Sequence, residues 1–415
     1  MISIPPIPQI GSAGISGNTL MRIFAEVIVF SLLLTGCRLT DESNAPEKGA
    51  EPWSVRMANT VMTLHPDLVY YDRPVGKEKW QYDIAMLAGA IDKLGSINER
   101  YSRYMKDYMD YFVTSDGEIP LYKPEDYSLD NIAPAKNLIT LYKRTGNEKY
   151  LKALHLFIDQ LKNQPVTQNG GYWHKNIYPS QMWLDGLYMA VPFMAQYGKE
   201  FDEPTWYDAA VKQIFIMYNK AVDPATGLMY HGWDETRTKA WCNPATGCSR
   251  FFWGRAMGWY MMSLVDALDY LPENHPKRDS VEIILNKTAE ALMKVRDKDT
   301  GLWYQVLDKG GEKGNYLEAS CSAMFIYVFA KGADQKYLPE KYGKIARETF
   351  TAMLGNFVSE DENGMVTIKQ ICSGSGLGGQ PYRDGSYDYY TSVKKVENDA
   401  KGVAPFIMAA IELRK

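Results

Sequence analysis

One carboxylate stands inside an almost entirely apolar stretch, HKNIYPSQMWLDGLYMAVPFMAQYG, which runs from His174 to Gly198. This residue is Asp185, and burying it without a partner would cost several kcal/mol, because an unpaired charge is removed from water. Asp130 lies in a second stretch of this kind, YSLDNIAPAKNL. Two neighbouring carboxylates permit acid–base chemistry, since the charge of one favours a proton on the other. The pair therefore predicts a catalytic cavity.

Further polar residues occupy corresponding places in successive segments. His174 and His231 each follow a glycine turn by three or four residues, and Arg255 lies in RFFWGRAMGWYMM. Tryptophans are interleaved with them: Trp173, Trp183, Trp233, Trp253 and Trp259. Arginine and histidine can donate to a substrate carboxylate, and aromatic faces suit sugar rings. The joint pattern predicts a carbohydrate-active enzyme with an anionic sugar. For single members, aromatic core packing or a buried Asp185–Arg255 ion pair is the alternative.

Twelve apolar-periodic segments would position these residues. They lie near 54–64, 80–95, 99–114, 129–145, 147–163, 181–197, 203–221, 251–271, 278–296, 316–332, 337–356 and 398–414. Alternate segments differ in kind: FWGRAMGWYMMSLVDAL is apolar nearly all round, whereas WYDAAVKQIFIMYNKAV has a charged face. We expect the first kind to be buried on all sides and the second kind to be half-exposed.

Four short stretches resemble one another, namely NGGYWHK, PATGLMYHG, KDTGLWYQV and DENGMVTIK. Each joins a glycine turn to alternating apolar residues, which is typical of a small hairpin, and such self-similarity indicates a repeat architecture. Twelve helices alternating between inner and outer positions predict an all-α fold, the closed (α/α)6 barrel; an open solenoid is the alternative. In the barrel the starts of the inner helices share one end. Asp185 would lie one turn into its helix there, and Asp130 at the start of another.

Composition excludes several classes of function. The chain has 46 basic and 50 acidic residues and no basic stripe, which argues against a nucleic-acid partner. The five histidines are scattered, and the sequence contains no CxxC or HExxH motif, so we expect no metal site. Aromatic residues make up 13% of the chain, in keeping with sugar binding. Cys242 and Cys248 bracket NPATG and could bridge a local loop in an oxidising compartment.

The N-terminus predicts export. MRIFAEVIVFSLLLTGC begins at Met21 and resembles a bacterial lipoprotein signal, in which Cys37 would be lipidated and become the mature N-terminus. Its apolar run is too short for a membrane span, and a plain secretory signal is the alternative. After residues 1–37, residues 38–52 read as a flexible tether, and 53–415 as the catalytic domain. We expect a lipoprotein in the periplasm or at the outer membrane, held to the membrane only through its lipid anchor.

Several strings resemble glycoside hydrolase family 105, the unsaturated rhamnogalacturonyl hydrolases: HKNIYPSQMWLDGLYMAVPF, YSLDNIAPAKNLITLY, MYHGWDE, FWGRAMGWY and NDAKGVAPF. The resemblance covers roughly residues 54–415, and MWLDGLYMA and WGRAMGW are its most specific strings. It implies that the substrate is a rhamnogalacturonan or pectin oligosaccharide, left by a lyase, with a terminal 4,5-unsaturated galacturonic acid. It implies no metal and no organic cofactor.

The same resemblance implies hydration of the C4=C5 double bond rather than attack at the anomeric carbon. Asp185 would protonate C4 and deliver water to C5 as general acid and base, and Asp130 would orient the sugar and tune Asp185. The implied substrate-binding residues are His174, Lys175, His231, Trp253, Arg255 and Trp259. One alternative is an unsaturated glucuronyl hydrolase acting on glycosaminoglycan or ulvan-type fragments. Another is a surface sugar-binding lipoprotein without catalysis, which would have no need of the Asp pair.

Overall fold

Six helices form an inner ring in the computed structural model, which describes residues 51–414. They are α3 (Tyr82–Asp92), α5 (Ala135–Thr145), α7 (Leu184–Glu200), α9 (Gly254–Leu268), α11 (Ala319–Asp334) and α14 (Ala400–Glu412). Every residue of α9 is buried, as the apolar run predicts. Small residues allow the close packing: a Cβ built on Gly258 would lie 2.5 Å from the sulfur of Met324 on α11.

Six further helices surround this ring. They are α2 (Trp53–Leu64), α4 (Glu99–Phe112), α6 (Glu148–Asn163), α8 (Thr205–Ala221), α10 (Arg278–Lys294) and α12 (Lys341–Phe357). In α4 the buried side chains recur at intervals of three and four residues, and charged residues occupy the other face. This helical period buries one stripe and leaves the rest in solvent. The expected alternation of buried and half-exposed helices is confirmed.

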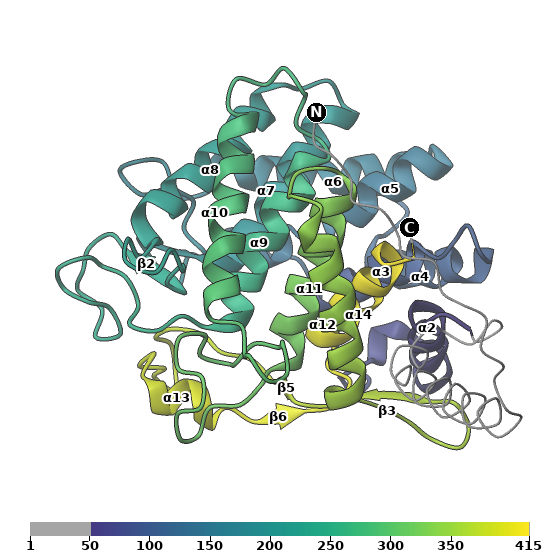
Figure 1. The fold of residues 1–415 in the computed structure, drawn as a ribbon. Helices are drawn as coiled ribbons and strands as arrows, with labels where there is room; N and C mark the ends of the chain where they lie inside the picture. Colours follow the sequence, from purple (N-terminus) through teal and green to yellow (C-terminus); the bar gives the residue numbers. More distant parts are fainter. Residues whose placement is uncertain (1–50, 415) are drawn as a thin grey trace, which may run out of the picture. The chain divides into compact units, whose positions relative to one another are not determined.

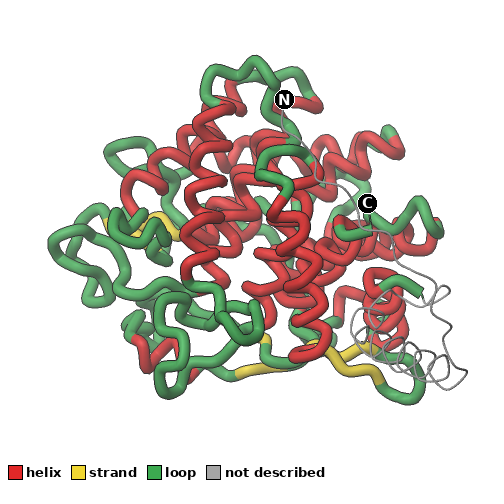
Figure 2. The backbone as a smooth tube through the Cα atoms, viewed as in Figure 1, coloured by secondary structure: helices red, strands yellow, loops and turns green. Residues whose placement is uncertain are grey.

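The ring is closed by its last helix. α14 packs against α3 as well as α11, so the sixth inner helix adjoins the first (Figure 1). Between α3 and α5, Asn137 Nδ2 donates a hydrogen bond of 2.8 Å to the carbonyl of Ala85. Figure 2 shows the helices forming the body of the described chain, with the strands in the segments that connect them. The predicted (α/α)6 barrel is therefore confirmed, and the open solenoid is wrong.

The loops contain three two-stranded antiparallel sheets. These pair β1 (Gln181–Trp183) with β2 (Gly232–Asp234), β3 (Val358–Glu360) with β4 (Val366–Ile368), and β5 (Ile371–Cys372) with β6 (Lys395–Val396). The loops also contain the 3-10 helices η1 (Leu68–Tyr70), η2 (Pro124–Asp126) and η3 (Leu129–Asn131), and the short helix α13 (Tyr387–Ser392). In the first sheet Met182 lies opposite Trp233, which ties the loop before α7 to the loop after α8.

Two of the similar glycine turns repeat one another in detail. The amide of Gly227 donates to the carbonyl of Asp223 at 2.8 Å, and the amide of Gly301 donates to the carbonyl of Asp297 at 2.9 Å. Both glycines have a positive φ, of 79° and 71°, which side chains disfavour. Each Asp side chain also accepts hydrogen bonds from a threonine three residues later. The self-similarity in the sequence thus corresponds to a repeated turn structure.

The predicted helix over 129–145 begins later than expected. Only η3 forms at its start, and α5 begins at Ala135, directly after Pro134. Proline fits the start of a helix but disfavours helical geometry in the residue before it. Asp130 therefore lies on the short 3-10 turn and not on the inner helix itself.

The predicted helix over 181–197 also starts differently. Its first three residues are held extended as β1 by their pairing with β2, and α7 begins at Leu184. Asp185 is thus in the first turn of α7 rather than one turn into it. The short helix α13 was not expected from the sequence, which has no long apolar period there.

The expectations for the N-terminus fall mainly outside the described residues. The signal in residues 1–37, with Cys37, and the tether up to residue 50 belong to that part of the chain. Residues 52–415 form one compact unit. Within the described residues, no helix is both long enough and apolar enough to cross a membrane.

Four cysteines are buried free thiols: Cys242, Cys248, Cys321 and Cys372. The loop bridge that Cys242 and Cys248 would allow is thus not formed in the structure. Backbone hydrogen bonds hold this loop instead, among them one of 2.8 Å from the amide of Asn243 to the carbonyl of Cys248.

Candidate active site

The expected site residues are carried by loops and helix starts. Asp185 and Arg255 each occupy the second position of an inner helix, α7 and α9 respectively. Asp130 lies on η3 before α5, and His231 directly precedes β2. All four segments thus belong to the end of the barrel at which the inner helices begin.

Asp185 lies beside His231, and a hydrogen bond to Tyr390 fixes the other ring nitrogen of this histidine. The Nε2 atom of His231 lies 3.2 Å from Oδ2 of Asp185, and its Nδ1 lies 2.8 Å from the hydroxyl of Tyr390. The backbone fixes the approach, because the amide of Leu184 donates to the carbonyl of His231 at 3.0 Å. Oδ2 is buried and has no hydrogen-bond partner in the described chain, since the angle to His231 is unfavourable. This oxygen is therefore available to a substrate.

Asp130 has different neighbours. Lys175 forms an ion pair with its Oδ2, and Nε2 of His174 lies 3.8 Å from its Oδ1. The amide of Leu129 donates to the carbonyl of His174 at 3.0 Å, which holds the loop of both basic residues against η3. The structure thus brings His174 and Lys175 together with Asp130, and His231 together with Asp185.

The two basic neighbours decide the charge of Asp130. Burial alone would raise the pKa of Asp130, but Lys175 and His174 outweigh this effect and the pKa is lowered. Burial lowers the pKa of His174 to about 4, against a weaker opposing effect of Asp130, so this imidazole is neutral near pH 7. Asp130 is therefore a carboxylate that stays ionised.

Arg255 is held almost completely by the protein. Its Nε donates to the hydroxyl of Ser320 at 2.9 Å, its Nη2 donates to the carbonyl of Cys372, and a carboxylate oxygen of Glu318 lies 3.8 Å away. Its side chain is only 1% exposed, and Nη1 has no hydrogen-bond partner among the described residues. Arg255 pairs with Glu318 and not with Asp185, so the alternative of a buried Asp185–Arg255 ion pair is wrong. One nitrogen of Arg255 is left for an anionic ligand.

Glu318 was not identified from the sequence. It caps α11 by accepting hydrogen bonds from the amides of Ser320 and Cys321, and it accepts another from the amide of Cys372. It is fully buried, so its negative charge balances the guanidinium of Arg255. Glu318 therefore fixes the orientation of Arg255 through the start of α11.

Stacked rings form one wall beside the carboxylates. Trp183, two residues before Asp185, stacks on His174 at 4.5 Å and on Tyr178 at 4.7 Å between ring centroids. Trp183 also meets His231 edge-on at 5.5 Å. Trp253 lies 4.8 Å from the ring of His231. The histidine rings are thus clamped by tryptophans, which limits their rotation and keeps them aimed at the Asp pair.

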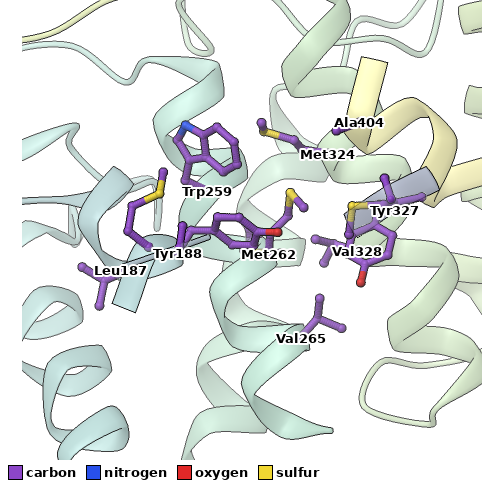
Figure 3. Packing of buried hydrophobic residues seen from close by; sticks show 14 of the residues in the cluster. Leu187, Tyr188, Trp259, Met262, Val265, Met324, Tyr327, Val328 and Ala404 are labelled. Atoms are coloured by element: carbon purple, nitrogen blue, oxygen red, sulfur yellow. The ribbon is translucent and has the colours of Figure 1, made fainter. Parts of the chain in front are cut away.

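Trp259 lies deeper than expected for a substrate contact. It is fully buried, meets Tyr82 edge-on at 5.8 Å and stacks on Tyr188 at 4.9 Å. Figure 3 shows Trp259 against the ring of Tyr188 within the packed core. We call Tyr82, Tyr188 and Trp259 the aromatic floor. Trp259 therefore acts on the site indirectly, by packing against Tyr82 and Tyr188.

Tyr82 and Tyr390 were not identified from the sequence. Burial and the charges of Asp83, Asp130 and Asp185 all raise the pKa of Tyr82 well above its usual value, which places it near both site carboxylates. Tyr82 is the first residue of α3, and Asp185 is the second residue of α7. This shared position at the start of an inner helix is a signal that could have identified Tyr82 from the sequence. Tyr390 belongs to α13, in a loop without any periodic pattern.

The loop from Cys372 to Tyr390 supports several site residues at once. Its first residue accepts a hydrogen bond from Arg255, its last hydrogen-bonds to His231, and Leu377 packs against Trp183. The part of the chain that the structure describes contains no group of three or more His, Cys, Asp or Glu residues that could hold a metal ion. The side chains gathered at this site carry carboxyl, imidazole, guanidinium, ammonium and hydroxyl groups.

Comparison with known proteins identifies the family of the chain. Residues 53–415 match the model of Glycosyl Hydrolase Family 88. A solved glycoside hydrolase of family 105 from C. acetobutylicum ATCC 824 is 42% identical, with a TM-score of 0.84 over 88% of this chain and 99% of that one. The unsaturated glucuronyl hydrolase of Bacillus sp. GL1 is only 12% identical, with a TM-score of 0.65 over 87% of this chain and 95% of that one, so it supports the fold alone.

Two relatives complete the comparison. Protein Atu3128 of Agrobacterium fabrum is 39% identical over 233 residues, which are 54% of this chain and 97% of the relative. The unsaturated rhamnogalacturonyl hydrolase YesR of Bacillus subtilis is 28% identical over 250 residues, 59% of this chain and 67% of the relative. The predicted membership of family 105 is confirmed by its solved member. The chain is thus a glycoside hydrolase of the family that the family 88 model describes, with family 105 enzymes among its relatives.

Proposed function

We propose that this enzyme removes a terminal 4,5-unsaturated galacturonic acid from rhamnogalacturonan or pectin oligosaccharides that a lyase has produced. The observation that carries the proposal is the pair of unlike carboxylates. Asp130 is ionised through its ion pair with Lys175, whereas Asp185 faces His231 with one oxygen unsatisfied. The name of the relative YesR, an unsaturated rhamnogalacturonyl hydrolase, supports the choice of substrate.

In the proposed reaction Asp185 donates its proton to C4 of the double bond. Water then adds to C5 and gives its proton to the Asp185 carboxylate, which restores the starting state. The hemiketal formed at C5 opens, and the rest of the oligosaccharide leaves. Asp185 sits beside His231, whose other nitrogen is fixed by Tyr390, so the carboxyl group keeps one orientation through both proton transfers.

The remaining residues would bind the sugar. The unpartnered Nη1 of Arg255 is suited to the substrate carboxylate, because a guanidinium donates charge-assisted hydrogen bonds. Asp130 would accept hydrogen bonds from sugar hydroxyls, since an ionised carboxylate is an acceptor only. Lys175 would keep it in that state, and the stacked wall at Trp183 would exclude water from the ring.

A panel of lyase-generated disaccharides tests the substrate. The conjugated double bond absorbs in the ultraviolet, so loss of absorbance reports its hydration. We expect loss with unsaturated galacturonyl-rhamnose and none with Asp185→Asn. Loss only with unsaturated glucuronyl disaccharides would instead support the glucuronyl hydrolase. No loss with any member of the panel would support a sugar-binding protein.

A second experiment tests which bond reacts. An ordinary glycosidase needs an acid on the leaving oxygen and a second carboxylate across the ring, and it would cleave saturated galacturonyl oligosaccharides. Hydration at C4=C5 leaves these inert. In water enriched in heavy oxygen, the label should enter at C5 of the released keto sugar. Label at C1, or brisk cleavage of a saturated substrate, would contradict the mechanism.

We propose in addition that the enzyme is exported and anchored through a lipid on Cys37. The support is the sequence from Met21 to Cys37, with its arginine, apolar run and LTGC ending. Labelled palmitate supplied to an expressing bacterium should enter the wild-type chain and not Cys37→Ala. A wild-type chain without label would contradict the anchor.

A further inference from the structure

A cavity of about 230 Å³ lies along the barrel axis, behind the aromatic floor. Tyr82 and Tyr188 of the floor form its end nearest the active site. Lys93, Asp269 and Tyr270 line its other end, where inner helices α3 and α9 stop. Lys93 is exposed there and the other two are partly exposed, so the cavity approaches solvent on the side away from Asp185.

The charged side chains around this cavity do not balance. They are Asp92, Lys93, Lys136, Asp266, Asp269 and Lys331. Arg144 neutralises Asp92 through two hydrogen bonds of 2.8 Å. Lys331 lies 2.7 Å from Asp266 and 2.5 Å from Asp269. Without Asp92, the cavity has three lysines, Lys93, Lys136 and Lys331, and two aspartates, Asp266 and Asp269. The net charge of these five side chains is therefore +1.

Besides the exposed Lys93, Lys136 is the cation of this cavity without a counter-ion among the described residues. Among the described residues it forms no ion pair: its ammonium lies 3.3 Å from the hydroxyl of Tyr188 and 4.3 Å from the centroid of that ring. Burial lowers the pKa of Lys136 to about 8; Asp266 opposes this shift, and Lys93 and Lys331 add to it. A half-buried ammonium without an ion pair is stabilised by an anion placed beside it.

The rest of the lining suits a small hydroxylated molecule. Thr140, Gln196 and Asp269 offer hydrogen-bonding groups, and the rings of Tyr270 and Tyr327 offer flat surfaces. Pockets for drug-sized ligands measure about 300–1,000 Å³. A cavity of about 230 Å³ suits a smaller molecule, such as a single sugar ring.

We propose that this cavity is a second binding site, separate from the catalytic end, for a small hydroxylated monocarboxylate of the size of one sugar acid. The ligand carboxylate pairs with Lys136 and the hydroxyls meet the polar groups nearer the opening. The entry lies at the far end of the barrel, and the aromatic floor separates this ligand from Asp185. The inference does not depend on which sugar the catalytic end accepts.

Calorimetric titration of the full chain with D-galacturonate tests the proposal, because this sugar acid can fill both ends. Lys136→Met should remove one binding event per chain or weaken it about 10- to 100-fold, since a charge-assisted hydrogen bond is lost. Lys143→Met is the matched control: Lys143 lies on the same helix but its side chain is 52% exposed and pairs with Glu200. Identical isotherms for wild type and Lys136→Met would overturn the site.

Three further results keep the proposal open to contradiction if Lys136→Met folds poorly. Lys136→Arg keeps the charge and should keep the binding event. D-galactose, which lacks the carboxylate, should not produce that event; equally tight binding of galactose would exclude a carboxylate site. A crystal structure with D-galacturonate should place its carboxylate beside Lys136. Density confined to the Asp185 end would overturn the proposal.

Discussion

The two ends of the barrel treat buried polar groups in opposite ways. Where the inner helices begin, several buried polar atoms have no hydrogen-bond partner in the described chain: Oδ2 of Asp185, Nε2 of His231, Nδ1 of His174, Nη1 of Arg255 and Nε1 of Trp259. Toward the other end, Asp266 accepts from the hydroxyl of Tyr327 and from Lys331, both at 2.7 Å, and Lys331 also reaches Asp269.

This difference separates chemistry from stability. Buried polar groups are normally satisfied, and an orphaned one requires an explanation. The orphans on Asp185, His231, His174 and Arg255 are groups poised for a ligand, which the fold retains at the expense of stability. The satisfied cluster of Asp266, Tyr327 and Lys331 holds α9 against α11. The comparison predicts that substitutions at the first end change turnover and those in the satisfied cluster change stability.

The largest effect is expected at Asp185. Asp185→Asn keeps the shape of the side chain but cannot cycle a proton, so turnover should fall about 10²–10⁴-fold. Because Oδ2 has no hydrogen-bond partner in the described chain, the midpoint of urea unfolding should change little. Steady-state rates and unfolding curves measure the two effects. Turnover within a few-fold of wild type would exclude Asp185 as the acid.

The opposite outcome is expected at Lys331. Lys331→Met leaves Asp266 and Asp269 without their cation, and breaking a buried ion pair destabilises by about 3–5 kcal/mol. Turnover per folded molecule at low temperature should be unchanged. Lys344→Met is the control, since Lys344 on α12 is 83% exposed. If Lys331→Met lost turnover while its unfolding free energy stayed normal, the division between the two ends would fail.

Arg255 combines the two roles, since it supports the fold and also has a nitrogen that can bind the substrate. Three of its contacts are structural, with Ser320, Cys372 and Glu318, and only Nη1 is free for the substrate. Arg255→Lys should raise KM about tenfold. The guanidinium of Arg255 is planar and can donate hydrogen bonds to the protein and to the substrate at once, whereas the ammonium of a lysine is a point charge that cannot do both in this geometry. Substrate binding to the variants, measured in parallel, checks this. An unchanged KM would assign Arg255 to structure alone.

The sequence predicts much of this fold because the signals are local. Helical period, small residues and glycine turns act within about twenty residues, and they give the twelve helices and the closed ring. The starts of α5 and α7 were placed less well. A proline and a pairing with β2, 50 residues further along the chain, decide these starts. The loop from 372 to 390 has no period, so its support of Arg255, Trp183 and His231 was not foreseeable.

The Asp signal itself is ambiguous in sequence. Asp266 stands in the apolar run MMSLVDAL just as Asp185 stands in MWLDGL. What distinguishes them is a lysine 65 residues further along, which arrives beside Asp266 only after α9 and α11 pack. The resemblance to a known family selected Asp185, whereas the apolar setting alone would have selected both. Partners distant in the chain are what separate a structural carboxylate from a reactive one.

The smallest expected effect concerns pH and His174. Burial lowers the pKa of His174 to about 4 in the folded protein, from 6.5 when exposed. Between these values the unfolded chain binds more protons, so stability falls as the pH falls through this window. Between pH 7.5 and 5.5, His174→Gln should lose about 1 kcal/mol less unfolding free energy than wild type. The lowered pKa of Asp130 adds nothing in this range, since its ordinary value is 3.8.

Urea unfolding at both pH values measures the difference in this loss of stability, with His155→Gln on the exposed face of α6 as control. Equal losses in wild type and His174→Gln would mean that His174 does not remain neutral in the folded protein at pH 5.5.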